Sequence, residues 1–174
     1  MRTKRHGQAG QSWYVDETYV KVKGKWCYLY RAIDEDGNLV DSRLSERRDM
    51  KAAQRFFKQA LVVVGHPPER VTTDGHASYP RAVRETLGDN VQHRTNTYLN
   101  NCLEQNHRGI KQRYYPMHGF GNFDSAARFC CAFDELRNYL HPRNTMGEPA
   151  SRSEQRQAFL NRLTALKSSM QAAF

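Results

Sequence analysis

The sequence contains no long apolar run. A membrane-spanning helix needs roughly 20 consecutive apolar residues, whereas apolar runs here, such as residues 60–64, are short. The cations near the N-terminus are not followed by the apolar segment of a secretory signal. These absences predict a cytoplasmic protein with no membrane partner.

The sequence also lacks the paired cysteines of a zinc site or a disulfide framework. Its four cysteines form no C-x-x-C pair: Cys27, Cys102, Cys130 and Cys131. Cys102 lies near His107, but zinc binding needs a second ligand pair that the sequence does not supply. Buried free thiols are therefore the expectation.

Acidic residues are too few to balance the basic ones. The 27 Lys and Arg residues against 18 Asp and Glu residues give a formal charge of +9 and a pI of about 9.6. Such an excess suits a polyanionic partner. Composition alone does not decide whether the partner is a nucleic acid.

Hydrophobic periodicity predicts a mixed α/β fold. Residues 13–22, 26–33 and 39–44 are rich in aromatic and β-branched residues and are separated by tight turns, which predicts an antiparallel meander. Helical spacing and capping signals then alternate with short strands. The expected helices cover residues 50–64, 78–88, 101–115, 123–140 and a segment from the capping box at Ser151, and the expected strands cover 70–73 and 90–97. This order is that of the ribonuclease H-like fold, a mixed sheet flanked by helices with extra C-terminal helices.

The length of 174 residues fits one domain of ordinary size. Residues 1–12 are predicted to be a basic flexible arm or linker stub, residues 13–149 the core, and residues 150–174 a C-terminal helical extension. The apolar stripes of the last two helices favour packing in the core or at a subunit interface.

Three acids occupy positions that suit a metal site. Asp16 lies within the first predicted strand, where an unpaired carboxylate is costly, and Asp74 follows the strand at 70–73. Strand ends are where open α/β sheets build their sites. Glu104 lies on a helix whose His107, Arg108 and Lys111 share its face at i+3, i+4 and i+7. Carboxylates on separate elements suit Mg²⁺, and two such ions can catalyse an in-line phosphoryl displacement.

Several segments resemble the insertion sequence six family of bacterial and archaeal transposases. The resemblance is carried by residues 15–26, 28–34, Thr73-Asp74, and Asn100-Asn101 before Glu104, with later support from 137–142 and 147–149. It implies that Asp16, Asp74 and Glu104 are the catalytic DDE metal ligands. It also implies that Lys111, seven positions after Glu104, belongs to the catalytic signature.

The resemblance further implies the reaction and its partners. We expect Mg²⁺, with Mn²⁺ as a substitute, to support nicking at the ends of a transposable element and strand transfer into target DNA. The expected partners are terminal-repeat DNA, target DNA and further copies of the chain in a homodimer or higher assembly, in a prokaryotic cytoplasm. The weaker candidates for DNA contact are His107, Arg108, Lys111 and Arg113.

Two features depart from the family pattern. The segment between Asp74 and Glu104, residues 75–103, is shorter than in the family. Only 12 residues precede the first predicted strand, which predicts a catalytic core without the helix-turn-helix segment that reads element ends. A catalytically silent remnant that binds DNA or dimerises is therefore an alternative, and another ribonuclease H-like nuclease is a third.

Several nearby residues have more than one interpretation. Strand alternation turns Glu17 to the face opposite Asp16, which favours a structural role or a DNA-facing neighbour. His76 is a weaker candidate beside Asp74. Asp34 and Asp36 are expected in a hairpin turn. A cationic run is either a solvated face or a DNA contact: Arg43, Arg47, Arg48, Lys51, Arg55 and Lys58.

Overall fold

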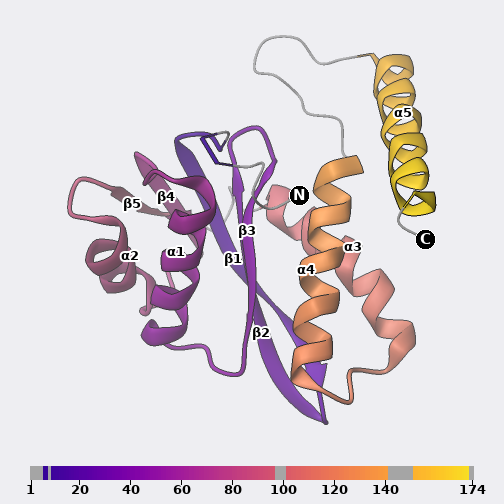
Figure 1. Cartoon of the computed structure of the whole chain (residues 1–174). Helices are drawn as coiled ribbons and strands as arrows, with labels where there is room; N and C mark the ends of the chain where they lie inside the picture. Colours follow the sequence, from indigo (N-terminus) through magenta and orange to yellow (C-terminus); the bar gives the residue numbers. More distant parts are fainter. Residues whose placement is uncertain (1–5, 8, 97–100, 141–150, 173–174) are drawn as a thin grey trace.

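The computed structural model describes residues 6–7, 9–96, 101–140 and 151–172, without the side chains of residues 101–106. Its elements in chain order are β1 (Ser12–Val22), β2 (Lys25–Asp34), β3 (Leu39–Ser45), α1 (Met50–Val64), β4 (Arg70–Thr73), α2 (Tyr79–Leu87), β5 (Gln92–Thr95), α3 (Asn101–Tyr114), the 3₁₀ helix η2 (Tyr115–Met117), α4 (Phe123–Leu140) and α5 (Arg152–Gln171). The predicted elements are all present, and most of their boundaries agree within two residues. Figure 1 shows their arrangement.

One five-stranded sheet organises the chain, with strand order β3-β2-β1-β4-β5. Strands β1, β2 and β3 form the predicted antiparallel meander, while β4 pairs in parallel with β1 and β5 in parallel with β4. Asp34, at the end of β2, accepts backbone hydrogen bonds from Asp36 and Asn38, which confirms the predicted turn. The sheet and its neighbours form the mixed ribonuclease H-like architecture that the sequence predicts.

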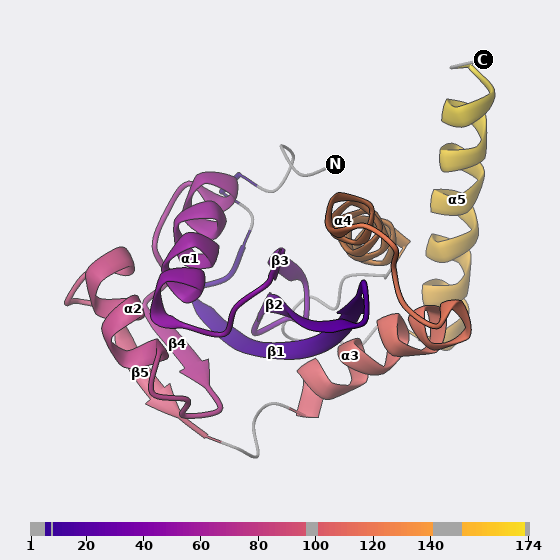
Figure 2. The same ribbon diagram turned by 90° about the horizontal axis from the view of Figure 1, so that it is seen from below.

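Helices cover both faces of the sheet, as Figure 2 shows. Helices α1 and α2 pack on one face over a core that includes Trp13, Tyr30 and Phe56, all fully buried. Helices α3 and α4 pack on the other face over a second core that includes Val20 and Leu29. Strands β1 and β2 therefore contribute alternate side chains to two different cores.

Local signals explain where the helices begin and end. Asp49 caps α1 by accepting a hydrogen bond from Ala52 N at 2.8 Å, and Gly65 ends the helix in the left-handed conformation with φ of 88°. Pro116 follows the end of α3 and lies in η2. Ser151 forms the predicted capping box with Glu154.

Helix α5 departs from the expectation of a core stripe. None of its described residues is buried, and Phe159 and Met170 are 39% and 57% exposed. Its apolar residues therefore do not contribute to either core. The predicted role of α5 at a subunit interface stays a prediction.

Two of the described cysteines agree with the expectation of buried thiols. Cys27 and Cys130 are free and buried, and Cys131 is half-buried; the side chain of Cys102 lies outside the described residues. Among the described helices none is long and apolar enough to cross a membrane.

Candidate metal centre at the sheet edge

Asp16 and Asp74 meet where two parallel strands separate. Strand β4 pairs with β1 only along Ser12–Tyr14, so Asp16 lies just past the end of this ladder. Asp74 directly follows Thr73, the last residue of β4. Because β1 and β4 do not pair beyond Tyr14, side chains of β1 after this point can approach Asp74.

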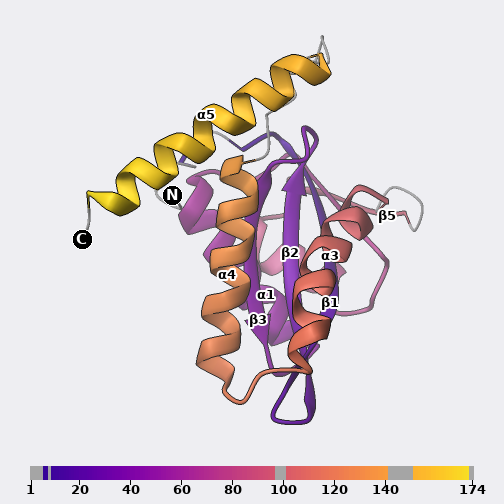
Figure 3. The same ribbon diagram turned by 90° about the vertical axis from the view of Figure 1, so that its right-hand side faces the viewer.

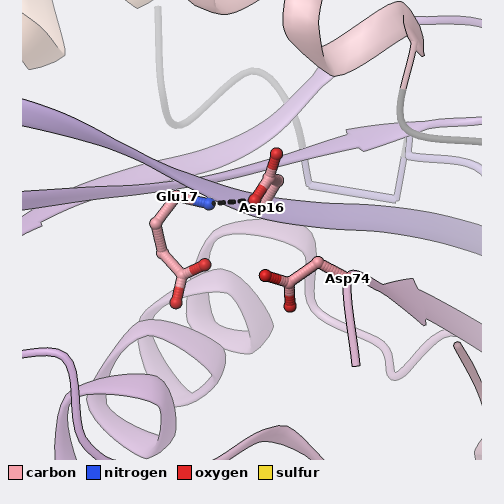
Figure 4. A group of neighbouring side chains, drawn as sticks. All are labelled: Asp16, Glu17 and Asp74. Atoms are coloured by element: carbon pink, nitrogen blue, oxygen red, sulfur yellow. Dashed lines mark hydrogen bonds between the residues drawn. The ribbon is translucent and has the colours of Figure 1, made fainter. Parts of the chain in front are cut away.

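Glu17 joins these two aspartates although it points to the other face of β1. One carboxylate oxygen from each of Asp16, Glu17 and Asp74 lies within 4.8 Å of the others. Figure 4 shows the carboxylates of Glu17 and Asp74 turned toward each other and that of Asp16 above them at the β1 ribbon, with the backbone N–H of Glu17 donating to Asp16 Oδ1 at 2.8 Å. We name these three residues the acidic cluster. Where β4 ends, side chains from both faces of β1 can approach Asp74. Strand alternation alone does not predict that Glu17 and Asp16 lie close together there.

Arg48 supplies positive charge to the acidic cluster. Its Nη2 lies 2.8 Å from Asp74 Oδ2, and its Nε lies 3.3 Å from Glu17 Oε1. The side chains of Glu17 and Arg48 are 2% and 24% exposed, so this contact is shielded from water on the Glu17 side. The cationic run that contains Arg48 was expected to be solvated or to contact DNA, whereas this member binds the acids.

One guanidinium does not neutralise three carboxylates. Burial is the main cause that raises the pKa of Asp16 from 3.8 to about 6, and the charges of Glu17 and Asp74 raise it further. The backbone N–H of Glu17 and the charge of Arg48 lower it. Additional positive charge would therefore be stabilised here, and grouped carboxylate oxygens are the donors that hard divalent cations prefer.

The third predicted metal ligand is only partly described. Glu104 lies in α3, but its side chain is outside the described residues. One helical turn later, His107 Nδ1 is 3.9 Å from Asp16 Oδ2. Residues three apart lie on the same side of a helix. The turn of α3 from Glu104 to His107 therefore passes beside the acidic cluster.

His107, one of the weaker candidates for DNA contact, is buried, with 6% of its surface exposed. The reason is spacing: His107, Ile110 and Tyr114 follow i, i+3 and i+7, and this face packs against the sheet. Burial lowers its pKa to about 3, and the charges of Arg31, Lys111 and Arg137 contribute. His107 is therefore a neutral neighbour of Asp16 rather than a solvated cation.

The remaining basic candidates lie farther along α3. Arg108 and Arg113 are exposed and Lys111 is half-buried. His76 contacts Asp74 through its backbone N–H, 3.0 Å from Oδ1, while its ring Nδ1 contacts Ser78 Oγ at 2.8 Å. The ring of His76 therefore uses Nδ1 for Ser78 and is not among the grouped ligand atoms of the described residues.

Sequence reasoning missed Glu17 and Arg48 as members of this site. The available signal was the adjacency of Glu17 to Asp16 at a strand edge, together with a cation between β3 and α1. Neither signal shows that Glu17 and Arg48 contact each other and that Arg48 contacts Asp74, because these contacts join residues that are distant in the sequence.

The chain is similar to known proteins over most of its length. Residues 10–142 match a family model described as a DDE domain. Over 113 residues the chain is 39% identical to the transposase for insertion sequence-like element IS431mec of Staphylococcus aureus, covering 63% of this chain and 50% of the relative. The chain thus spans about half the length of the curated relatives that it matches first.

Solved structures show the same fold at low identity. The integrase catalytic core domain of HTLV-2 in complex with magnesium, in its dimeric form, aligns with a TM-score of 0.58 and 17% identity, covering 82% of this chain and 95% of that one. The BIV integrase catalytic core aligns with a TM-score of 0.54 and 12% identity, covering 91% and 99%. At these identities the likeness supports the fold alone.

Proposed function

Because the chain belongs to the DDE transposases of the insertion sequence six family, we propose that it is a catalytic core that nicks DNA at element ends and transfers the freed strand. The observation that carries this proposal is the acidic cluster at the end of the β1–β4 ladder. The family is one of polynucleotidyl transferases. Activity of this chain, which spans half the length of its relatives, is part of the proposal.

Asp16 and Asp74 are the proposed metal ligands from the sheet, and Glu104 is the proposed ligand from α3. Support for Glu104 comes from His107, which follows it by one turn and lies 3.9 Å from Asp16. Glu17 adds a carboxylate beside these ligands and binds Arg48. DDE integrase-like domains use divalent metals, and we propose Mg²⁺, with Mn²⁺ as a substitute.

Bound divalent ions would polarise the attacking and leaving oxygens of an in-line displacement. The chain's own residues have three tasks in this proposal. Asp16 and Asp74 fix the position of positive charge at the sheet edge, and Arg48 pairs with the Asp74 carboxylate when no metal is bound. Lys111, in the last turn of α3, is the proposed contact to a DNA phosphate beside the cluster, with exposed Arg108 and Arg113 as further contacts.

Terminal-repeat DNA and target DNA are the proposed substrates. The +9 charge of the chain favours a polyanion. We also propose self-association into a dimer or larger assembly, because strand transfer joins DNA ends and the solved HTLV-2 core is described as a dimeric form.

The test is a nicking and strand-transfer assay with labelled duplex DNA that carries the terminal repeats flanking the gene. Wild-type protein should form a nicked product only with Mg²⁺ or Mn²⁺. The Asp74→Asn variant should lose this product, because it keeps the side-chain shape but removes a charged ligand. The matched control is Asp89→Asn, an exposed aspartate in the turn after α2, which should retain activity.

Two results would count against the proposal. One is the absence of metal-dependent product with wild-type protein that is folded by circular dichroism. The other is equal product from wild-type protein and Asp74→Asn, which would show a contaminating nuclease.

A further inference from the structure

An exposed aromatic surface continues from the acidic cluster towards the β1–β2 turn. Tyr19 pairs with Tyr28 across β1 and β2, and Lys21 pairs with Trp26. The ring centroids of Tyr19 lie 5.4 Å from Tyr28 and 6.3 Å from Trp26. We name Tyr19, Trp26 and Tyr28 the aromatic strip.

The strip lies on the sheet face that α1 and α2 cover elsewhere. Further along this face Tyr30 stacks on Phe56 of α1, with 5.8 Å between centroids, and is fully buried. Beyond Tyr30 the cover ends: Tyr19 is 47% exposed and Trp26 is 55% exposed. Figure 3 shows the β1–β2 hairpin extending past the ends of the helices.

Aromatic pairing within a hairpin explains part of this arrangement. Cross-strand aromatic pairs stabilise antiparallel strands by a few tenths of a kcal/mol to about 1 kcal/mol. Tyr19 and Tyr28 gain from that pairing. It does not explain why two large rings keep about half of their surface in water, side by side on an open face.

Cations surround the strip. Lys21 Nζ lies 5.8 Å from the centre of the Trp26 ring. Lys21, Lys23 and Lys25 are exposed around the turn, and Arg47 is exposed just after β3. Aromatic faces flanked by positive charge are the chemistry that holds single-stranded nucleic acid, in which bases stack on rings and phosphates meet cations.

The strip is continuous with the acidic cluster. Glu17 precedes Tyr19 by two residues on the same face of β1, a separation of roughly 7 Å along a strand. Glu17 in turn contacts Arg48, which contacts Asp74. A strand lying on the strip would therefore run towards the candidate metal centre.

We propose that the aromatic strip binds unpaired nucleotides of DNA, with bases stacked on Trp26 and Tyr19 and with phosphates on the lysines of the turn. The proposal rests on the proposed function, since it names where a strand leading to the acidic cluster is held. Unpaired DNA is favoured over duplex because bases stacked inside a duplex do not offer their faces. The surrounding charge favours DNA over an apolar protein partner.

The two tryptophans make a direct test possible. Trp13 is fully buried and Trp26 is 55% exposed, and the chain has no other tryptophan. An oligothymidylate titration without divalent cations should therefore quench the emission of Trp26 to saturation. Trp26→Phe should lose the quenching but keep affinity, measured by anisotropy of labelled oligothymidylate, because phenylalanine still stacks.

Removal of the rings should weaken binding. Trp26→Ala and Tyr19→Ala should each raise the Kd for oligothymidylate about tenfold, as expected for the loss of one base-aromatic stack. The matched control is Phe159→Ala, an exposed aromatic residue on α5, which should leave the Kd unchanged. Thermal melting of each variant verifies that it is folded.

Three results would overturn the proposal. They are unchanged affinity in folded Trp26→Ala and Tyr19→Ala, equal quenching by duplex DNA of the same length, or dissociation of a dimer by Trp26→Ala with no effect on DNA binding. The last result would assign the strip to a second copy of the chain.

The measurement is independent of the proposed catalysis because it excludes divalent cations. Nicking by wild-type protein together with normal oligothymidylate binding by Trp26→Ala would remove the strip and keep the catalytic proposal. Specific loss of binding in Trp26→Ala, with no metal-dependent nicking by wild-type protein, would keep the aromatic strip as a binding surface and remove the catalytic proposal.

Discussion

Arg48 donates a hydrogen bond to Asp74, with Nη2 2.8 Å from Oδ2. The same guanidinium also contacts Glu17 through Nε and Nη2. Arg48 therefore occupies one side of a carboxylate that is also a proposed metal ligand. A divalent cation at Asp74 gains from that carboxylate and is repelled by Arg48.

Arg48→Gln should have opposite effects on stability and on metal binding. Without metal, the loss of charge leaves buried Glu17 without its cation, and the free energy of unfolding should fall by roughly 1–3 kcal/mol. Mn²⁺ should bind more tightly because the repulsion is removed. Urea denaturation with a chelator and calorimetric Mn²⁺ titration measure the two effects.

The matched control for Arg48→Gln is Arg55→Gln, an exposed position on α1. It removes the same charge from the chain while leaving the acidic cluster untouched. Weaker Mn²⁺ binding in Arg48→Gln than in Arg55→Gln would contradict the predicted competition and make Arg48 a support for the metal.

Divalent cations should stabilise the folded chain through the acidic cluster. A ligand that binds only the folded state at 100 times its Kd adds about 2.7 kcal/mol to the free energy of unfolding. Mg²⁺ or Mn²⁺ should therefore raise the Tm of wild-type protein and of Asp89→Asn. Asp16→Asn and Asp74→Asn should each reduce this rise.

The same melting experiment tests Glu104 without the need for activity. Glu104→Gln should also reduce the metal-induced rise in Tm, and exposed Glu69→Gln is the matched control. A full metal-induced rise in Glu104→Gln would mean that α3 contributes no ligand, and the proposed triad would then be wrong at this position.

Metal-free stability should depend on pH through Asp16. Its pKa is raised from 3.8 to about 6, so the folded state binds more protons than the unfolded state between these values. The contribution of Asp16 to stability is then present below pH 3.8 and is lost as pH rises through 6. A shift of this size corresponds to about 3 kcal/mol.

The measurement compares wild-type protein with Asp16→Asn in a chelator from about pH 4 to pH 7, which spans the loss of the proton at the raised pKa of Asp16. The variant should gain stability relative to wild-type protein as pH rises, because asparagine carries no charge to bury. A difference between the two proteins that stays constant with pH would show that Asp16 is not perturbed.

The sequence was sufficient to predict the fold because its signals are local. Asp49 before α1, Pro116 after α3 and the capping box at Ser151 are each readable within a few residues, and each marks the boundary that the structure has. Aromatic and β-branched composition likewise predicted β1, although burial of this strand on both faces is seen only in the structure.

The site was less predictable because its geometry depends on contacts between distant elements. Alternation correctly turned Glu17 away from Asp16, but the end of the β1–β4 ladder lets both carboxylates approach Asp74. His107 fits a polar face with Glu104 and equally a buried face with Ile110. Only the packing of α3 on the sheet decides between these faces.

A buried ion pair between the sheet and α4 provides the last prediction. Arg31 of β2 and Asp134 of α4 are 2% and 1% exposed, and Nη2 lies 2.7 Å from Oδ1. Arg31→Met should lower the free energy of unfolding by about 3–5 kcal/mol, because Asp134, whose pKa burial already raises, then stays buried without its main partner. Asp134→Leu should be destabilising for the corresponding reason.

The double variant Arg31→Met with Asp134→Leu should be more stable than either single variant, because it leaves neither of these two charges in the interior and replaces both with apolar side chains of similar volume. Urea denaturation of the four proteins gives the coupling energy directly. Arg81→Met on α2 is the control, since its pair with Glu85 is exposed and its loss should leave stability nearly unchanged. Additive losses in the double variant would mean that Arg31 and Asp134 stabilise the chain by packing rather than by their mutual charge.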